Sequence, residues 1–392
     1  MVSWSIDCGR LPVEANLACF RGAGGTAEYQ VSLTPLDYAA VETQLGWLEQ
    51  AYQIVLEAAG LTADSAIFRR FFCSDLPNQA AALAACSSAD PVDYQHPCAV
   101  SWVGQPPIPP AKVCLWAYHL ADPVGPLQKT KDGATLTLRR GPLSHHWSTG
   151  LAAPAASGSY AQTQAVFAAY ETILAERGLT LADHTVRTWL FVQNVDANYA
   201  GLVTARRELF SARGMTAETH YLASTGIEGR HAKVPALVAM DAYAVGGLRP
   251  EQVEYLQALD HLSPTHLYGV TFERGTAVSY RDRRHLFISG TASIDHQGEI
   301  LHYGDVGRQL DRALENVAAL LAQGGGGLAD MGGYIAYVRD TADGPLVRER
   351  LRAVVGDAPL VVVTAPVCRP GWLVEVEGLA AVAASRPELP AW

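Results

Sequence analysis

The sequence predicts an α/β (α+β) fold made of three tandem units, each of which combines a β-sheet with helices. The main observation is an order of elements that occurs three times. In each copy an amphipathic stretch is followed by a Gly-Leu step, an Ala-Asp step, an apolar strand ending at an aspartate, and later a second apolar strand. The second observation is size, because 392 residues, 49% of them hydrophobic, suffice for two or three domains with sizeable cores. We interpret the pattern as a true repeat, with general α/β similarity as the alternative.

The amphipathic stretches predict one helix in each unit. They occupy residues 38–58, 160–176 and 306–323. Their apolar residues recur at spacings of three, four and seven, which is typical of a helix that packs one face on a sheet.

The strands predict where the units begin and end. The first strands lie within 59–75, 177–196 and 325–340, and they close at Asp75, Asp196 and Asp340. The second strands lie within 111–121, 232–245 and 368–382. We therefore expect units at 1–140, 141–248 and 249–392, of which the first is the most degenerate.

The composition argues against several classes of protein. A net charge of −10 disfavours nucleic acid as a partner, since such binding needs a basic surface. No apolar run is long enough to span a membrane, and the first ten residues, "MVSWSIDCGR", do not resemble a signal peptide, so we expect a cytoplasmic protein. The seven scattered cysteines form no C-x-x-C pair, and the twelve histidines show no metal-ligand spacing. We expect no bound metal.

The last predicted strand, "VCRPGWLVEVEGLAA", carries two carboxylates in an apolar setting. Because a strand alternates its faces, Glu375 and Glu377 share one face with Leu373 and Leu379. Aligning the units places Glu375 at the position of Trp116 and Ala239, so only the third unit has an acid there. Apolar neighbours favour a functional Glu375 over a solvated one.

A second alignment concerns Glu377, which falls at the position of Asp241 in the middle unit. An acid that recurs in two units suggests a structural, hydrogen-bonding role. We therefore leave Glu377 out of the expected site.

The third unit resembles the RidA/YjgF family of reactive-intermediate deaminases. The resemblance rests on "FISGTASIDHQGEILHYGDVGRQLDRALENVAALL", "YVRD" and "VCRPGWLVEVEGLAA". It implies three RidA-like units joined as a pseudo-trimer, with ligand clefts between units. It also implies that Arg369 holds a ligand carboxylate, with a surface salt bridge as the alternative. Since three units already complete the ring, we expect a monomer or a weak dimer.

Residues from about 160 to 385 also resemble the chorismatase family. The motifs are "RTWLFVQNVDANYAGLVTARRELF", "THYLASTGIEG", "YGVTFERGTAV" and "SGTASI". This resemblance implies release of pyruvate from chorismate, with Glu375 as the general acid that protonates the enol ether. Chorismate has the same formula as pyruvate plus 3-hydroxybenzoate, so the reaction is redox-neutral and we expect no cofactor.

Further residues are candidates for binding the dianionic substrate. Guanidinium groups suit carboxylates, and Arg274 and Arg187 are therefore candidates beside Arg369. The "THYLASTGIEG" segment offers hydroxyl and backbone groups, with an ordinary core role as the alternative for its tyrosine. The candidates in this segment are Tyr221, Ser224, Thr225 and Gly226.

The expected ring product depends on the wall of the site. Cys368 is a candidate catalytic thiol, although no histidine partner is evident, and a role in shaping the wall is favoured. Together with Gly275, it resembles the wall of the type that forms 3-hydroxybenzoate. The alternatives are 3,4-dihydroxycyclohexa-1,5-diene carboxylate or 4-hydroxybenzoate as product, or an enamine/imine deaminase or a ligand-binding protein of the RidA type. Such acids often prime larger natural products of secondary metabolism.

Overall fold

The computed structural model describes all 392 residues and contains three six-stranded sheets. The first sheet contains β1 (Val2–Ser5), β2 (Val13–Arg21), β3 (Ala27–Pro35), β4 (Ala66–Cys73), β5 (Ala99–Val103) and β6 (Val113–Ala121). The second contains β7 (Gln128–Asp132), β8 (Thr135–Arg140), β9 (Leu143–Ala152), β10 (Thr185–Val192), β11 (Ala223–Glu228) and β12 (Val238–Gly246). The third contains β13 (Val253–Leu256), β14 (Gly275–Ser279), β15 (Arg283–Ala292), β16 (Met331–Val338), β17 (Leu360–Thr364) and β18 (Val374–Ala383).

The three sheets share one topology. In each, the first three strands follow one another, the sixth strand lies between the third and the fourth, and the fifth lies at an edge, parallel to the fourth. This common order confirms the predicted fold class of tandem sheet-plus-helix units.

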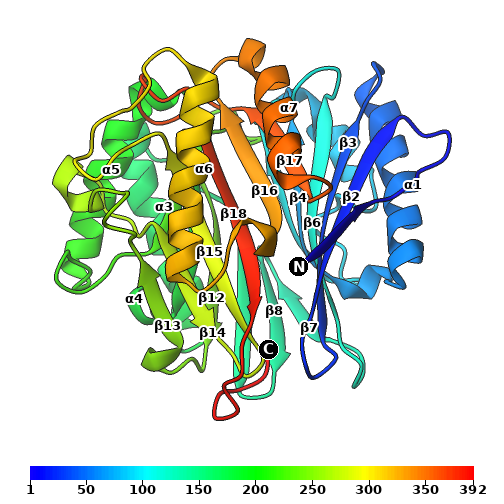
Figure 1. Cartoon of the computed structure of the whole chain (residues 1–392), viewed down its shortest axis with the longest axis horizontal. Coiled ribbons are helices and arrows are strands. Elements are labelled where there is room, and N and C mark those ends of the chain that lie inside the picture. The colour runs from blue at the N-terminus through cyan, green and yellow to red at the C-terminus, as the bar shows by residue number, and fades with distance from the viewer.

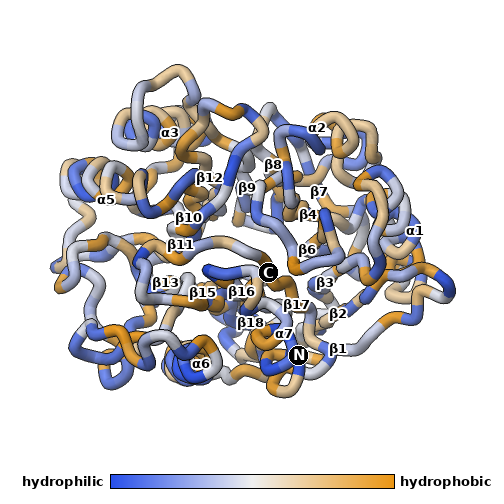
Figure 2. The backbone as a smooth tube through the Cα atoms, turned by 90° about the horizontal axis from the view of Figure 1, so that it is seen from above, coloured by the Kyte–Doolittle hydropathy of each residue, from blue (hydrophilic) through white to orange (hydrophobic).

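Helices surround the strands on the outside of the molecule (Figures 1 and 2). They are α1 (Val41–Ala59), α2 (Leu76–Ala84), α3 (Gly158–Ala175), α4 (Leu181–His184), α5 (Val195–Ala212), α6 (Val306–Gln323) and α7 (Gly344–Val355). The three predicted helices correspond to α1, α3 and α6. No helix has the length and apolar character needed to cross a membrane.

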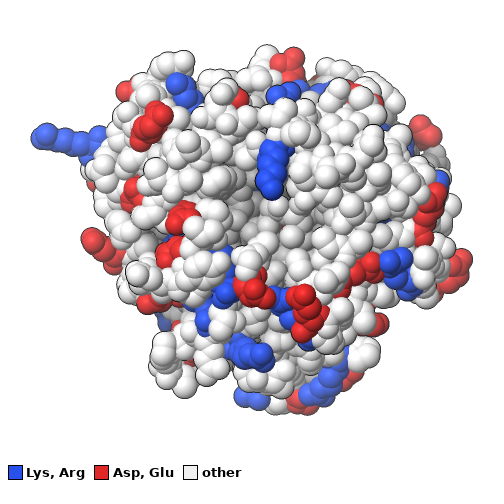
Figure 3. Space-filling view, turned by 180° about the vertical axis from the view of Figure 1, so that it is seen from behind, with Lys and Arg blue, Asp and Glu red and all other residues white.

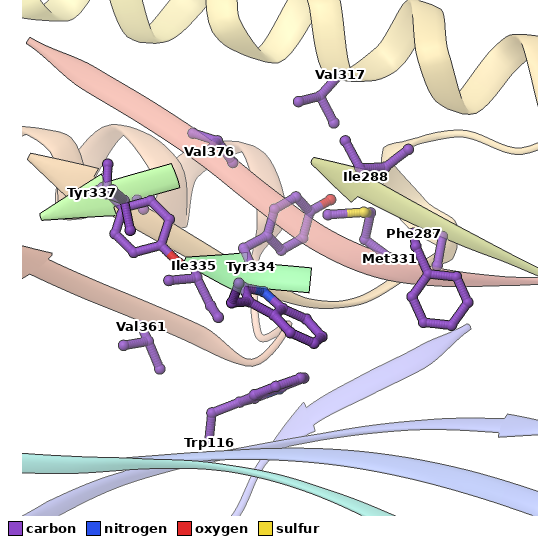
Figure 4. Close-up of a cluster of buried hydrophobic side chains, with 14 of the residues drawn as sticks. Trp116, Phe287, Ile288, Val317, Met331, Tyr334, Ile335, Tyr337, Val361 and Val376 are labelled. Carbon is purple, nitrogen blue, oxygen red and sulfur yellow. The ribbon is translucent and has the colours of Figure 1, made fainter. Parts of the chain in front are cut away.

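Helix α6 illustrates how the sequence determines these elements. The Asp305 side chain accepts a hydrogen bond from the Arg308 amide and so caps the helix start. Val317 of α6 packs with Val376 and Ile288 on one face of the third sheet, as Figure 4 shows. The other face of this sheet turns toward the first and second units. Its alternate strand positions, which include both glutamates of β18, therefore point to the interior of the molecule.

Two predictions about the strands differ from the structure. The expected boundary at residue 140 falls inside the second sheet, because β7 and β8 hydrogen-bond with β9. The third unit's last strand begins at Val374 rather than residue 368, since Pro370 and Gly371 belong to a turn before it.

The alignment of Glu375 with Trp116 is also wrong. Glu375 pairs with Tyr337, the seventh residue of β16, whereas Trp116 pairs with the fifth residue of β4. The equivalent residue of the first unit is Cys114. A shift of two residues leaves every side chain on the same face, so alternation alone does not detect it. The alignments of Glu375 with Ala239 and of Glu377 with Asp241 agree with the structure.

A buried arginine–carboxylate pair joins each unit to the next. Arg70 binds Asp241 at 2.8 Å between the first and second units, and Arg187 binds Glu377 at 2.7 Å between the second and third. Arg283 binds Glu28 between the third and first. All six side chains are at most 4% exposed.

Side chains from all three sheets line a central cavity between them. Its aromatic lining comprises Phe68, Trp116, Tyr118, Trp147, Trp189, Tyr243, Phe287 and Trp392. On the outside, the face in Figure 3 carries few charged side chains near its centre, so the net charge of −10 is not concentrated there.

Candidate active site

The candidate site is a cleft between the second and third units, along the edge strand β11. The third unit touches this strand at both ends, where Ala223 forms a bridge with Glu273 and Ile227 forms a bridge with Val367. The residues between the two bridges, Ser224 to Gly226, line the cleft. Between the bridges the Ser224 amide donates to the Ser289 hydroxyl at 2.9 Å and the Gly290 amide donates to the Thr225 hydroxyl at 2.8 Å, so the third unit contacts the middle of β11 without a continuous backbone ladder.

Glu375 lies on the third unit's side of this cleft. Its carboxyl group rests over Gly290 of β15, where an added Cβ would lie 1.9 Å from the Glu375 Oε1 atom. The Thr225 methyl group would lie 3.0 Å from the same Cβ. Only glycine at position 290 leaves room for the carboxyl group. Glu375 is 6% exposed, and no hydrogen bond of the structure satisfies its carboxyl oxygens.

The surroundings of Glu375 favour its protonated form. Burial, and then the negative charge of Glu377, raise the pKa of Glu375 to about 8, although Arg187 and Arg274 oppose the shift. At neutral pH the carboxyl group therefore holds its proton and can donate it.

Glu377 has the structural role that its recurrence predicts. Its carboxylate accepts hydrogen bonds from Arg187, from the Trp189 indole at 2.8 Å and from the Thr225 hydroxyl. These bonds fix the Glu377 carboxylate two residues from Glu375, and its negative charge raises the pKa of its neighbour.

Three arginines line the cleft, and two of them have a nitrogen atom without a hydrogen-bond partner. Arg206 of α5 donates to Thr271 and Ser224 at 3.2 and 3.5 Å, but its second terminal nitrogen has no partner. Arg274 donates to the Ser263 carbonyl at 3.0 Å, and its Nε atom has no partner. Arg369 donates to the Tyr268 carbonyl at 2.8 Å.

These three arginines differ from the ones that join the units. Arg70, Arg187 and Arg283 each pair with a buried carboxylate, whereas none of the cleft arginines forms an ion pair. Arg206 and Arg274 are nevertheless only 1% and 5% exposed. Buried charges are normally paired, so the cleft has the electrostatics of an anion-binding site.

Cys368 and Tyr199 form one wall of the cleft. Burial and the nearby Glu375 raise the pKa of the Cys368 thiol to about 12. The thiol is therefore protonated at neutral pH, which favours a wall residue over a nucleophile.

The structure brings most of the predicted site residues together. Seven line the cleft, namely Glu375, Cys368, Arg369, Ser224, Thr225, Gly226 and Arg274. Three do not line it. Tyr221 packs against Phe210 in the second unit's core, Gly275 lies against the Phe287 carbonyl, and Arg187 is held by Glu377.

Four residues that are not among the predicted ones also line the cleft, namely Tyr199, Arg206, Tyr268 and Trp372. Tyr199 and Arg206 are seven residues apart on α5, which places them on one helix face. This spacing is the feature of the sequence that could have identified Tyr199 and Arg206 as a pair. The segment 263–274 lacks such periodicity, and only the fold shows that Tyr268 reaches the site. The structure has no cluster of three His, Cys, Asp or Glu side chains suited to a metal ion.

Comparisons with known proteins give relatives for both the fold and the site. A family model described as Endoribonuclease L-PSP matches residues 276–382. A 3-hydroxybenzoate synthase of Streptomyces hygroscopicus is 29% identical over 243 residues, covering 55% of this chain and 69% of that protein. A chorismatase of Streptomyces rapamycinicus is 31% identical over 220 residues, covering 50% and 63%. A chorismatase crystal structure matches with a TM-score of 0.60 and 20% identity, over 81% of this chain and 93% of that one.

The fold is that of three tandem RidA-like units, with the cleft between the second and third. The resemblance to the chorismatase family that the motifs predict is confirmed by these relatives, whose names are those of enzymes.

Proposed function

We propose that the chain is a chorismatase that releases pyruvate from chorismate in the cleft between its second and third units. The observation that carries this proposal is a buried, protonated Glu375 facing a cleft with three unpaired arginines. A named chorismatase and a named 3-hydroxybenzoate synthase among the relatives support it.

The charges of the cleft suit a dianion. Arg206, Arg274 and Arg369 carry three positive charges, and Glu375 is largely neutral below pH 8. Chorismate carries two carboxylates and an uncharged enol ether. Two carboxylates satisfy the free donors of the arginines, and the planar guanidinium groups can bind each of them in a fixed orientation.

Glu375 is the proposed general acid. Its proton goes to the terminal methylene carbon of the enol ether, which leaves an oxocarbenium ion and a Glu375 carboxylate. Attack of an oxygen on this cation, or elimination, breaks the ether bond and frees pyruvate. Chorismate has the same formula as pyruvate plus 3-hydroxybenzoate, so the ring loses a proton when the aromatic product forms and Glu375 regains one. General acid catalysis of this kind contributes about 10²–10⁴-fold.

The ring product that we propose is 3-hydroxybenzoate. Cys368 in the cleft wall supports it, as does the name of one relative. Gly275 adds no geometric support, because it lies outside the cleft. The dihydroxycyclohexadiene acid and 4-hydroxybenzoate are the alternative products, and Cys368→Ala tests whether the wall determines the choice.

The test is incubation of the purified protein with chorismate. Pyruvate is followed with lactate dehydrogenase, and the ring product is identified by chromatography against the three acids. We expect stoichiometric pyruvate and 3-hydroxybenzoate, and Arg369→Lys should raise KM, because lysine lacks the planar fork. A parallel assay with an enamine substrate tests the deaminase alternative. Enamine hydrolysis without pyruvate release from chorismate would replace our proposal.

A further inference from the structure

Two of the cleft arginines donate to a single short segment of the third unit, residues 263–269, here called the 263–269 turn. It contains the 3₁₀ turn Thr265–Tyr268 and ends at Gly269, whose φ of +84° is in the left-handed region. Arg274 donates to the Ser263 carbonyl at 3.0 Å, and Arg369 donates to the Tyr268 carbonyl at 2.8 Å.

The Tyr268 ring adds a second contact to both arginines. The ring centroid lies 5.3 Å from the guanidinium carbon of Arg274 and 4.9 Å from that of Arg369. Both distances are within the range of cation–π attraction. Both guanidinium groups that would bind a carboxylate thus contact the same tyrosine ring.

We propose that the 263–269 turn competes with the ligand for these arginines, and that Tyr268 is the gate that a bound carboxylate displaces. This inference rests on the proposed function only in taking the ligand to be a carboxylate. A carboxylate bound between Arg274 and Arg369 can use their remaining N–H groups, but it draws both guanidinium groups away from the turn's carbonyls and from the Tyr268 ring.

The turn is attached in a way that allows such a movement. Its backbone amides bond locally, from Leu267 to Pro264 and from Gly269 to His266. The hydrogen bond from Arg369 ties its tip to the rest of the molecule. The start of the turn is anchored, because the Ser263 amide donates to the Asp295 carbonyl at 3.1 Å and the Thr265 hydroxyl donates to the Phe272 carbonyl at 2.7 Å, whereas Leu267 near the tip is 68% exposed. Loss of the Arg369 contact therefore loosens the tip around Tyr268, whose ring still packs beside the core.

The experiment measures binding of isophthalate, a planar dicarboxylate without an enol ether, by titration calorimetry. Tyr268→Ala and Tyr268→Leu both remove the aromatic face, and the leucine variant keeps most of the bulk. We expect both to bind isophthalate about three- to tenfold more tightly than the unmodified protein, the range that a lost cation–π competitor gives. Leu267→Ala, on the outer face of the same turn, should leave the affinity unchanged and controls for loosening of the turn.

The opposite result overturns the inference. If Tyr268 packs on the ligand rather than competing with it, both Tyr268 variants bind isophthalate more weakly. Absence of binding to every variant also overturns it. Because isophthalate does not react, this test is separate from the proposed function. Tighter binding of isophthalate by the Tyr268 variants, without pyruvate release from chorismate by the unmodified protein, would support the role of Tyr268 and exclude the chorismatase proposal.

Discussion

At the scale of single residues, the difference between Glu375 and Glu377 decides the chemistry of the cleft. Both are buried acids on the same face of β18. Glu377 receives three hydrogen bonds, one of them from Arg187, whereas Glu375 receives none and keeps its proton to about pH 8. Two chemically identical side chains thus acquire different roles from their neighbours.

Glu375→Gln should reduce pyruvate release by at least about 10²-fold, because an amide keeps the shape but has no acidic proton. In the unmodified protein the same assignment predicts that activity falls as pH rises through about 8, where Glu375 ionises. Steady-state rates between pH 6 and 10 measure both effects, and circular dichroism checks the fold. A glutamine variant with normal activity would exclude Glu375 as the acid.

Glu377→Gln should move the alkaline limb of the pH–rate profile to lower pH. The substitution removes the negative charge that raises the Glu375 pKa, and it leaves Arg187 unneutralised, which lowers that pKa further. Asp241→Asn is the matched control, because it breaks the equivalent ion pair at another interface. Equal shifts in both variants would show that lost stability, not the local charge, moves the limb.

At the scale of elements, helix α5 brings Tyr199 and Arg206 from the second unit to the cleft. Its start is held by the Glu228 carboxylate of β11, which accepts hydrogen bonds from the Asn194 and Val195 amides at 2.9 and 2.7 Å. A negative charge at this end also favours the helix dipole. The strand that lines the cleft therefore also fixes the helix that supplies its arginine.

Glu228→Ala should raise KM for chorismate several-fold, because the first turn of α5 loses its cap and the Tyr199 side chain one turn later becomes less fixed. The cap itself is worth about 1 kcal/mol, so most of the protein stays folded. Glu208→Ala, near the other end of α5 and exposed, is the control that should leave KM unchanged. A KM shift in the control alone would contradict this account.

The helices and strands also show which features of the structure can be predicted from the sequence. Amphipathic spacing predicts α1, α3 and α6 because one helix face is buried along the whole length. Alternation predicts the face of the strand on which Glu375 lies. It does not predict which residue of the first unit is equivalent to Glu375, since a shift of two residues keeps every side chain on the same face. Arg187 was predicted for the cleft because the sequence shows an arginine near the motif. The sequence does not show that Glu377 of another unit binds this arginine. Contacts between units are not visible in local patterns.

At the scale of the whole molecule, the three buried ion pairs link the units into one structure. The third pair shows how they respond to acid. The neighbouring His285 and Arg283, with a hydrogen bond from Tyr118 at 2.5 Å, hold the pKa of Glu28 at about 2 despite its burial. A carboxylate with a lowered pKa stabilises the fold above its ordinary pKa, and this contribution is lost as pH falls from about 4.5 to 2.

Glu28→Gln should therefore destabilise the protein at pH 7 by about 3 kcal/mol and much less at pH 2. Urea unfolding of both proteins at several pH values measures the difference, and Glu14→Gln, a half-buried acid nearer the surface, is the control. A destabilisation that does not depend on pH would mean that packing, rather than charge, is lost.

Joining three units in one chain has a consequence for how their interfaces can change. In an assembly of identical subunits, one codon specifies a residue at all three interfaces. Here the position of Glu375 has a separate codon in each unit, and the three residues are Cys114, Ala239 and Glu375. Each interface can thus acquire mutations independently, and the two walls of one cleft lie in separate stretches of the gene. Selection can alter the β11 side of the cleft while the Glu375 side stays fixed, a freedom that a symmetric trimer lacks.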